Sequence, residues 1–135
     1  MNKPLVSRTK IFCGGLFFIL FIGACAGMQA RDELQETVAK HHIDLRWGRF
    51  EKASQSVTPE LRNAFAAEWT AKTTRLELQE IEVTGMQIND AADAADVYIV
   101  VTWIDRASMQ VQTTQVQEHW VRVGTTWMAD KPAEL

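Results

Sequence analysis

The spacing of apolar residues changes once along this chain of 135 residues, near Thr74. From Asp32 to that point apolar side chains recur every three or four residues, which is the period of an amphipathic helix. After it they alternate with polar residues, which is the period of a strand. A chain that places its helices before its strands is expected to fold as α+β, with N-terminal helices packed on one face of a curved antiparallel sheet of about four strands.

Three helices are predicted in the first half of the chain. The first begins at Asp32, and its apolar face repeats at three- and four-residue steps: Leu34, Val38, His41, His42 and Leu45. Gly48 interrupts it, and a short second helix covers Phe50–Val57. The third begins at Thr58-Pro59-Glu60, because Thr is a good N-cap and Pro is tolerated in a first turn, and it ends near Lys72.

Four strands are predicted after Thr74: Leu76–Ile88, Val97–Ile104, Met109–Val123 and Thr126–Ala129. The apolar phase of the first strand slips by one residue twice, which indicates β-bulges. The phase of the third strand slips once, between Val111 and Val116. The second strand is apolar on both faces and is expected in the middle of the sheet. Gly124-Thr125 predicts a tight hairpin turn before the last strand.

This order of elements resembles the nuclear-transport-factor-2-like superfamily, which has a cystatin-like fold. The resemblance rests on the helices, the Thr58-Pro59-Glu60 segment and the closing hairpin, in which Trp120 and Trp127 flank Val123-Gly124-Thr125. It covers most of residues 32–130 and implies a cone-like sheet with a pocket between the sheet and the helices. Some members of the superfamily are isomerases or dehydratases that use a pocket Asp, Tyr or His, and many have no known activity. The alternative is another α+β domain with a different strand order.

The first 24 residues have the pattern of an export signal. Lys3, Arg8 and Lys10 precede an apolar run that ends in small residues. That run is shorter than the ~20 apolar residues that a spanning helix needs. Cleavage is therefore predicted, and an N-terminal anchor that is never cleaved is the alternative.

The residues Ile22-Gly23-Ala24-Cys25 resemble the lipobox of bacterial lipoproteins. The resemblance implies cleavage before Cys25, a thioether-linked diacylglycerol on its sulfur and acylation of its new amino terminus. Ala26 follows the cysteine, where an Asp would imply retention at the inner membrane, so an outer-membrane anchor facing the periplasm is expected. The predicted organisation is a signal at 1–24, a lipidated Cys25 with a short tether to residue 31, one domain at 32–130 and a polar tail at 131–135.

The mature chain is acidic. Of 14 basic residues three lie in the signal, which leaves 11 against 17 acidic residues and a net charge of −6. This balance argues against nucleic acid as a partner, because nucleic-acid binding needs basic patches. It also argues against electrostatic attraction to anionic lipid, so the acylated Cys25 is expected to provide the contact with the membrane. Since Cys25 is the only cysteine left, no intramolecular disulfide can form.

His41 and His42 are adjacent on the first predicted helix. Adjacent helical side chains point about 100° apart, so one of the pair is expected to pack and the other to meet solvent. A metal site would need further ligands three or four residues away, and only Asp44 stands near such a position. The sequence predicts no metal and no other cofactor.

Three side chains on the predicted strands are candidates for a pocket: Tyr98, Asp105 and His119. His119 has the chemistry of a general acid or base, and Asp105 and Tyr98 could bind a polar group. The simpler interpretation is a cross-strand histidine, a turn aspartate and a sheet tyrosine. Residues 98 and 105 differ by an odd number, so regular alternation places them on opposite faces. We therefore expect no catalytic residues.

The sequence favours a non-catalytic domain that binds or assembles with a protein partner, or with a second copy, at the cell envelope. One feature suggests a place for that contact: Gln110, Gln112, Gln115 and Gln117 form a neutral stripe along the third strand. Neutral polar edges are poorly protected against pairing with another strand, although a plain solvent face is the simpler interpretation. The alternative function is a small pocket enzyme or a small-ligand carrier.

Overall fold

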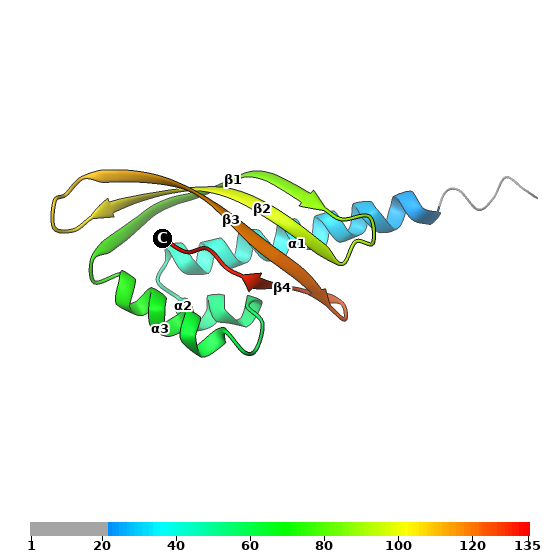
Figure 1. Ribbon diagram of the computed structural model, residues 1–135, viewed down its shortest axis with the longest axis horizontal. Helices are drawn as coiled ribbons and strands as arrows, with labels where there is room; N and C mark the ends of the chain where they lie inside the picture. Colours follow the sequence, from blue (N-terminus) through cyan, green and yellow to red (C-terminus); the bar gives the residue numbers. More distant parts are fainter. Residues whose placement is uncertain (1–21) are drawn as a thin grey trace, which may run out of the picture.

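The computed structural model describes residues 22–135, with side chains from Gly27 onward. Most of the predicted export signal, residues 1–21, lies outside the described residues. No helix between Ile22 and Leu135 is both long enough and apolar enough to cross a membrane. Helices come first along the chain and a four-stranded antiparallel sheet follows, as the change of period predicts (Figure 1).

The first helix, α1 (Ile22–Arg46), begins ten residues before the predicted start at Asp32. Residues 26–31 were expected to form a tether, but they are helical. The reason is that Ala30, which is 1% exposed, continues the apolar face one turn ahead of Leu34. Leu34 and Val38 follow at four-residue steps and are fully buried.

Two short helical turns follow α1, and a third helix completes the helical layer. α2 (Phe50–Ala53) and η1 (Ser54–Ser56) together match the predicted short helix. α3 (Arg62–Lys72) ends where it was predicted to end but begins four residues later than expected. Thr58 does not cap it, because the Thr58 amide donates to the Ala129 carbonyl at 3.0 Å and the chain at Val57 is extended.

The sheet consists of β1 (Leu76–Ile88), β2 (Ala94–Asp105), β3 (Val111–Val123) and β4 (Thr126–Lys131), in that order in space. β1 carries both predicted bulges, between Leu78 and Glu80 and between Val83 and Gly85. The predicted slip in β3 is wrong. β3 pairs with β2 without a shift, and its irregularity lies at His119/Trp120, against β4. Val111 had suggested the slip, but it is 64% exposed and needs no inward position.

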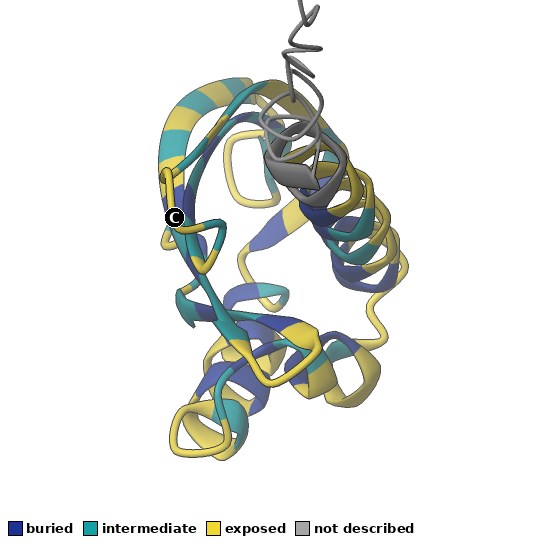
Figure 2. Cartoon of the chain, turned by 90° about the vertical axis from the view of Figure 1, so that its right-hand side faces the viewer, coloured by how far each residue is buried: buried dark blue, intermediate teal, exposed yellow. Residues whose placement is uncertain are grey.

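The core lies between the inner face of the sheet and the helices, and Figure 2 shows that buried stretches of the helices and strands border that space. Its largest fully buried side chains are Trp69 from α3, Trp120 from β3 and Trp127 from β4. The prediction that Trp120 and Trp127 are buried on opposite arms of the closing hairpin is confirmed. The residues after β4 are not a free polar tail, since Ala133 is 4% exposed and Leu135 packs against the core.

Candidate functional site

A buried carboxylate and a histidine meet in the interior between α1 and β3. His42 Nε2 lies 3.1 Å from both carboxylate oxygens of Glu118. Glu118 is fully buried, and His42 is 5% exposed. The even-numbered residues of β3 face the helices, which brings Glu118 and Trp120 to the inner side of the same strand. Trp120 Nε1 donates a second hydrogen bond to Glu118, at 3.1 Å.

The environment of Glu118 favours its ionised form. Burial by itself raises the pKa of a carboxyl group. At Glu118 the hydrogen bond and charge of His42, the charge of His41 and the hydrogen bond from Trp120 outweigh burial, so the pKa lies below its usual value. The carboxylate can only accept, so His42 Nε2 is the donor in this contact.

His41 occupies the other side of the cluster. Its Nδ1 donates to the Ala53 carbonyl at 3.0 Å, while its Nε2 is buried without a hydrogen-bond partner among the described residues. The ring lies edge-on to Trp120, with 5.4 Å between centroids, and 5.5 Å from the ring of Phe65. Because burial opposes the charged form, the pKa of His41 falls to about 4.

The prediction that one histidine of the pair would meet solvent is wrong. Both side chains are buried, and their ring centroids are 5.6 Å apart. The two side chains point about 100° apart, and both are buried because α1 packs against helices on one side and against the sheet on the other. His41 bonds to the end of α2, and His42 bonds to β3.

Acid is expected to destabilise the domain through His41. In the unfolded chain this histidine takes up a proton near its usual pKa of 6.5, whereas in the folded chain it does so only near 4. The unfolded state thus binds more protons between these values, and the free energy of unfolding falls as the pH drops through that window. At 1.36 kcal/mol per pKa unit, acidification from pH 7 to pH 4 should remove about 3 kcal/mol through this residue.

Urea unfolding of the wild type and of His41→Phe across this pH range measures the effect. Phenylalanine keeps the ring contacts and cannot titrate, so the fall in stability between pH 6.5 and pH 4 should become shallower by about 3 kcal/mol. An identical pH profile in the two proteins would contradict the assignment.

The structure does not bring Tyr98, Asp105 and His119 together. Tyr98 lies half-buried on the outer face of β2, against Gly85 of β1, where a Cβ would meet its ring at 3.5 Å. Asp105 ends the same strand and accepts hydrogen bonds from the amides of Ala107 and Ser108 in the following turn. Seven residues of strand, about 23 Å, separate it from Tyr98.

Asp105 and His119 each have a structural partner. The two amide hydrogen bonds lower the pKa of Asp105, whose side chain is open to solvent. His119 Nδ1 is 2.6 Å from Asp130 Oδ1, across the β3–β4 pair. Among the described residues no group of histidine, cysteine and acidic side chains has the arrangement of a metal site.

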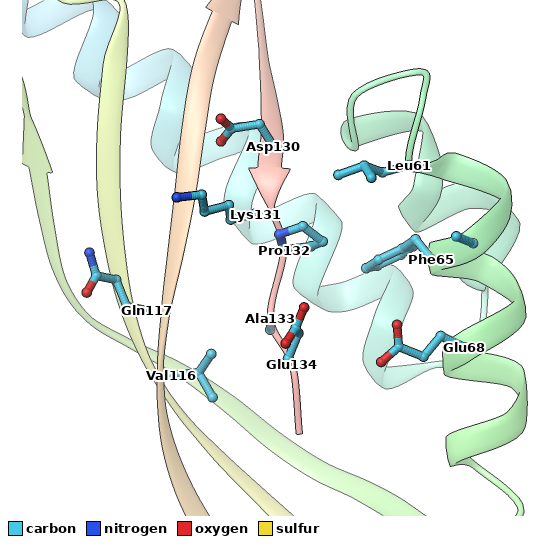
Figure 3. Close-up of a pocket in the computed structure, with 11 residues that line it drawn as sticks. Leu61, Phe65, Glu68, Val116, Gln117, Asp130, Lys131, Pro132, Ala133 and Glu134 are labelled. Atoms are coloured by element: carbon cyan, nitrogen blue, oxygen red, sulfur yellow. The ribbon is translucent and has the colours of Figure 1, made fainter.

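A groove of about 500 Å³ opens beside the buried cluster. Phe65 of α3 and Leu61, which directly precedes this helix, form one wall, and Val116 and Gln117 of β3 form the other (Figure 3). Residues 130–134, at the end of β4 and beyond it, run along the groove. Three acidic side chains and one basic side chain stand around it: Glu68, Asp130, Glu134 and Lys131. The Phe65 ring is 5.5 Å from the His41 ring, so Phe65 touches both the groove and the cluster.

Comparison with known proteins shows the fold. No family model matches the chain, and no curated protein matches it. An NTF2-like protein with a cystatin-like fold from Novosphingobium aromaticivorans is 14% identical, with a TM-score of 0.59 over 86% of this chain and 87% of that one.

Two proteins named as enzyme-like are similarly distant. A ketosteroid isomerase-like protein from Erwinia carotovora atroseptica is 13% identical, with a TM-score of 0.57 over 73% of this chain and 88% of its own. A putative polyketide cyclase from Xanthomonas campestris pv. campestris is 13% identical, with a TM-score of 0.59 over 75% of this chain and 90% of its own. At these identities the likeness establishes a cystatin-like fold for this chain, and it leaves the function to be argued from the residues.

Proposed function

We propose that this chain is a lipid-anchored protein of the cell envelope whose folded domain binds a protein partner and catalyses no reaction. The observation that carries this proposal is that bulky side chains fill the interior of the domain. Trp69, Trp120 and Trp127 fill the space between sheet and helices, and none is more than 1% exposed. A substrate would have to displace these side chains to reach His42 and Glu118, which already hydrogen-bond to each other.

The start of α1 supports a location close to the membrane. Ala30 belongs to the core and follows Cys25 by only five residues within one helix. At 1.5 Å per helical residue, this separation is about 8 Å along the helix axis. A lipid on Cys25 would therefore hold the domain against the bilayer. The β2–β3 turn lies at the opposite end of the molecule from the start of α1 (Figure 1).

Replacing Cys25 with serine tests the anchor. Serine has no thiol for the thioether, so Cys25→Ser should abolish lipid attachment and leave an unprocessed or released protein. Mass spectrometry of the membrane fraction measures the outcome, with the conservative change Cys13→Ser as the control that should still be acylated. An unmodified thiol at Cys25 in the wild-type protein would end the lipoprotein interpretation.

Photo-crosslinking in intact cells tests the binding role. A photoreactive amino acid can replace one exposed residue on each of three surfaces of the full chain: Val111 on β3, Trp47 after α1, and Glu82 on β1. A binding domain should give a discrete protein adduct, identifiable by mass spectrometry, from one surface and not from the others. The absence of protein adducts from all three positions would overturn the proposal.

A small-ligand carrier is the second candidate, and the groove is the observation that favours it. Its volume of about 500 Å³ is in the range of small-molecule sites, and Leu61, Phe65 and Val116 give it an apolar lining. Its acidic rim suits a ligand with an apolar body and a cationic group. Native mass spectrometry of the purified full chain should then show a bound small molecule that is lost from Phe65→Ala, and an unliganded mass would exclude this candidate.

A further inference from the structure

Half of β3 has a free edge. Among the described residues, β4 pairs with β3 only from His119 to Val123, so residues 111–118 pair only with β2. The Asp105 amide donates to the Gln110 carbonyl, which places the hydrogen-bonded pairs with β2 at even-numbered residues of β3. The backbone N–H and C=O groups of Val111, Thr113, Gln115 and Gln117 therefore point away from the sheet.

This edge lacks the usual protection against strand pairing. From Ala107 to Gln117 the chain carries no charged residue, and this part of β3 has no bulge. The opposite edge of the sheet, β1, carries Glu77, Glu80 and Glu82 and two bulges. Charges and bulges are the devices by which soluble sheets prevent edge-to-edge association. One edge of this sheet is thus guarded, and half of the other is open.

Exposed apolar side chains lie at the beginning of the free edge. Met109 is 74% exposed and has a φ of 56°, a left-handed conformation that a bulky side chain seldom adopts. Val111 beside it is 64% exposed.

We propose that the partner is a second copy of this chain, which joins its β3 edge to this one in antiparallel fashion about a two-fold axis at Thr113. The inference rests on the proposed binding function and names its partner. In this register Thr113 faces Thr113 of the second copy, and Val111 faces Gln115. The three outward-facing pairs form about six backbone hydrogen bonds, two for each pair.

The same symmetry covers the exposed apolar side chains of the edge. Met109 of one copy comes opposite Gln117 of the other, on the outer face of the joined sheet, and Val111 lies on the same face. Each copy supplies the same surface, as a two-fold interface requires. Charge favours the same edge: without the signal at 1–24 the chain has a net charge of −6, so two copies repel least where their surfaces are uncharged.

A charge exchange at Thr113 tests both the edge and the register. Thr113 is exposed, so Thr113→Glu and Thr113→Lys leave the core intact. Two full chains with different affinity tags are co-expressed, solubilised in detergent and purified through one tag. Wild-type copies should co-purify. Two Thr113→Glu copies, or two Thr113→Lys copies, should co-purify about tenfold less, because like charges then face each other at the axis. A Thr113→Glu copy paired with a Thr113→Lys copy should recover the wild-type yield.

Thr84→Glu is the matched control, an exposed threonine on the guarded β1 edge, and it should leave co-purification unchanged. Met109→Asn should weaken it, since asparagine tolerates the positive φ but lacks the apolar side chain that the second copy covers. Wild-type copies that fail to co-purify overturn the proposal, as does a Glu/Lys pair without recovery. A crosslink from position 111 to a protein of another mass also overturns the second copy as partner, while leaving the proposed binding function in place.

Discussion

Replacing Trp120 with alanine is expected to lower the free energy of unfolding by about 3–5 kcal/mol. The side chain is fully buried, and its ring packs edge-on against His41 with centroids 5.4 Å apart. Truncation leaves a cavity in the core and also removes the Nε1 hydrogen bond to Glu118. Both losses lower the stability of the fold, because a buried carboxylate that loses a hydrogen-bond donor no longer recovers the cost of its removal from water.

Urea unfolding followed by far-UV circular dichroism measures this loss. Trp47→Ala is the matched control, since Trp47 is 68% exposed and its replacement should change stability by about 0.5 kcal/mol or less. A Trp120→Ala protein with a wild-type midpoint would contradict the packing of the closing hairpin against α1.

The architecture was predictable because each element buries one face. Leu34, Val38 and Leu45 repeat at helical steps, and all three are buried in α1. The two phase slips of β1 marked real bulges because both flanking segments have apolar residues that must reach the same core. The odd number of residues between Tyr98 and Asp105 predicted opposite faces for them, and the regular pairing of β2 with β3 contains no bulge that would change this.

The errors in element boundaries have local physical causes. Thr58 has the chemistry of an N-cap, but a hydrogen bond to β4 holds it, and no local signal reports a contact with a strand 71 residues later. Val111 was assumed to face inward because it is apolar, whereas it lies at an exposed edge. An apolar residue at an exposed edge cannot be distinguished by composition from one in the core.

The buried cluster was missed for a different reason. Glu118 lies between Val116 and Trp120 in an alternating strand, and its even number places it on the same face as Trp120. That parity was visible in the sequence. An acidic residue in a strand is nevertheless expected to face solvent unless it is paired, and its partner, His42, lies 76 residues away on α1. The pair could be identified only after the packing of α1 on β3 was known.

Replacing His42 with leucine is expected to cost about 3–5 kcal/mol of stability at pH 7. Leucine is apolar and occupies a similar volume, so the loss comes mainly from Glu118, which remains buried with Trp120 Nε1 as its one remaining side-chain donor. The double variant His42→Leu/Glu118→Leu removes the charge as well. It should be more stable than the single variant by about 2 kcal/mol, short of full recovery because Trp120 Nε1 then lacks its acceptor.

The pH dependence of the single variant distinguishes charge from packing. Without His42, burial dominates and raises the pKa of Glu118 in the folded protein above its unfolded value. A carboxyl group whose pKa is raised in the folded protein destabilises the fold when it is ionised and does so much less when it is protonated. The loss of stability caused by His42→Leu should therefore shrink as the pH falls from 7 toward 4 and grow as the pH rises. The double variant lacks this carboxyl group and should show no such trend. If the penalty of the single variant is the same at both ends of this range, the effect is one of shape, and Glu118 is not held as a buried carboxylate by His42.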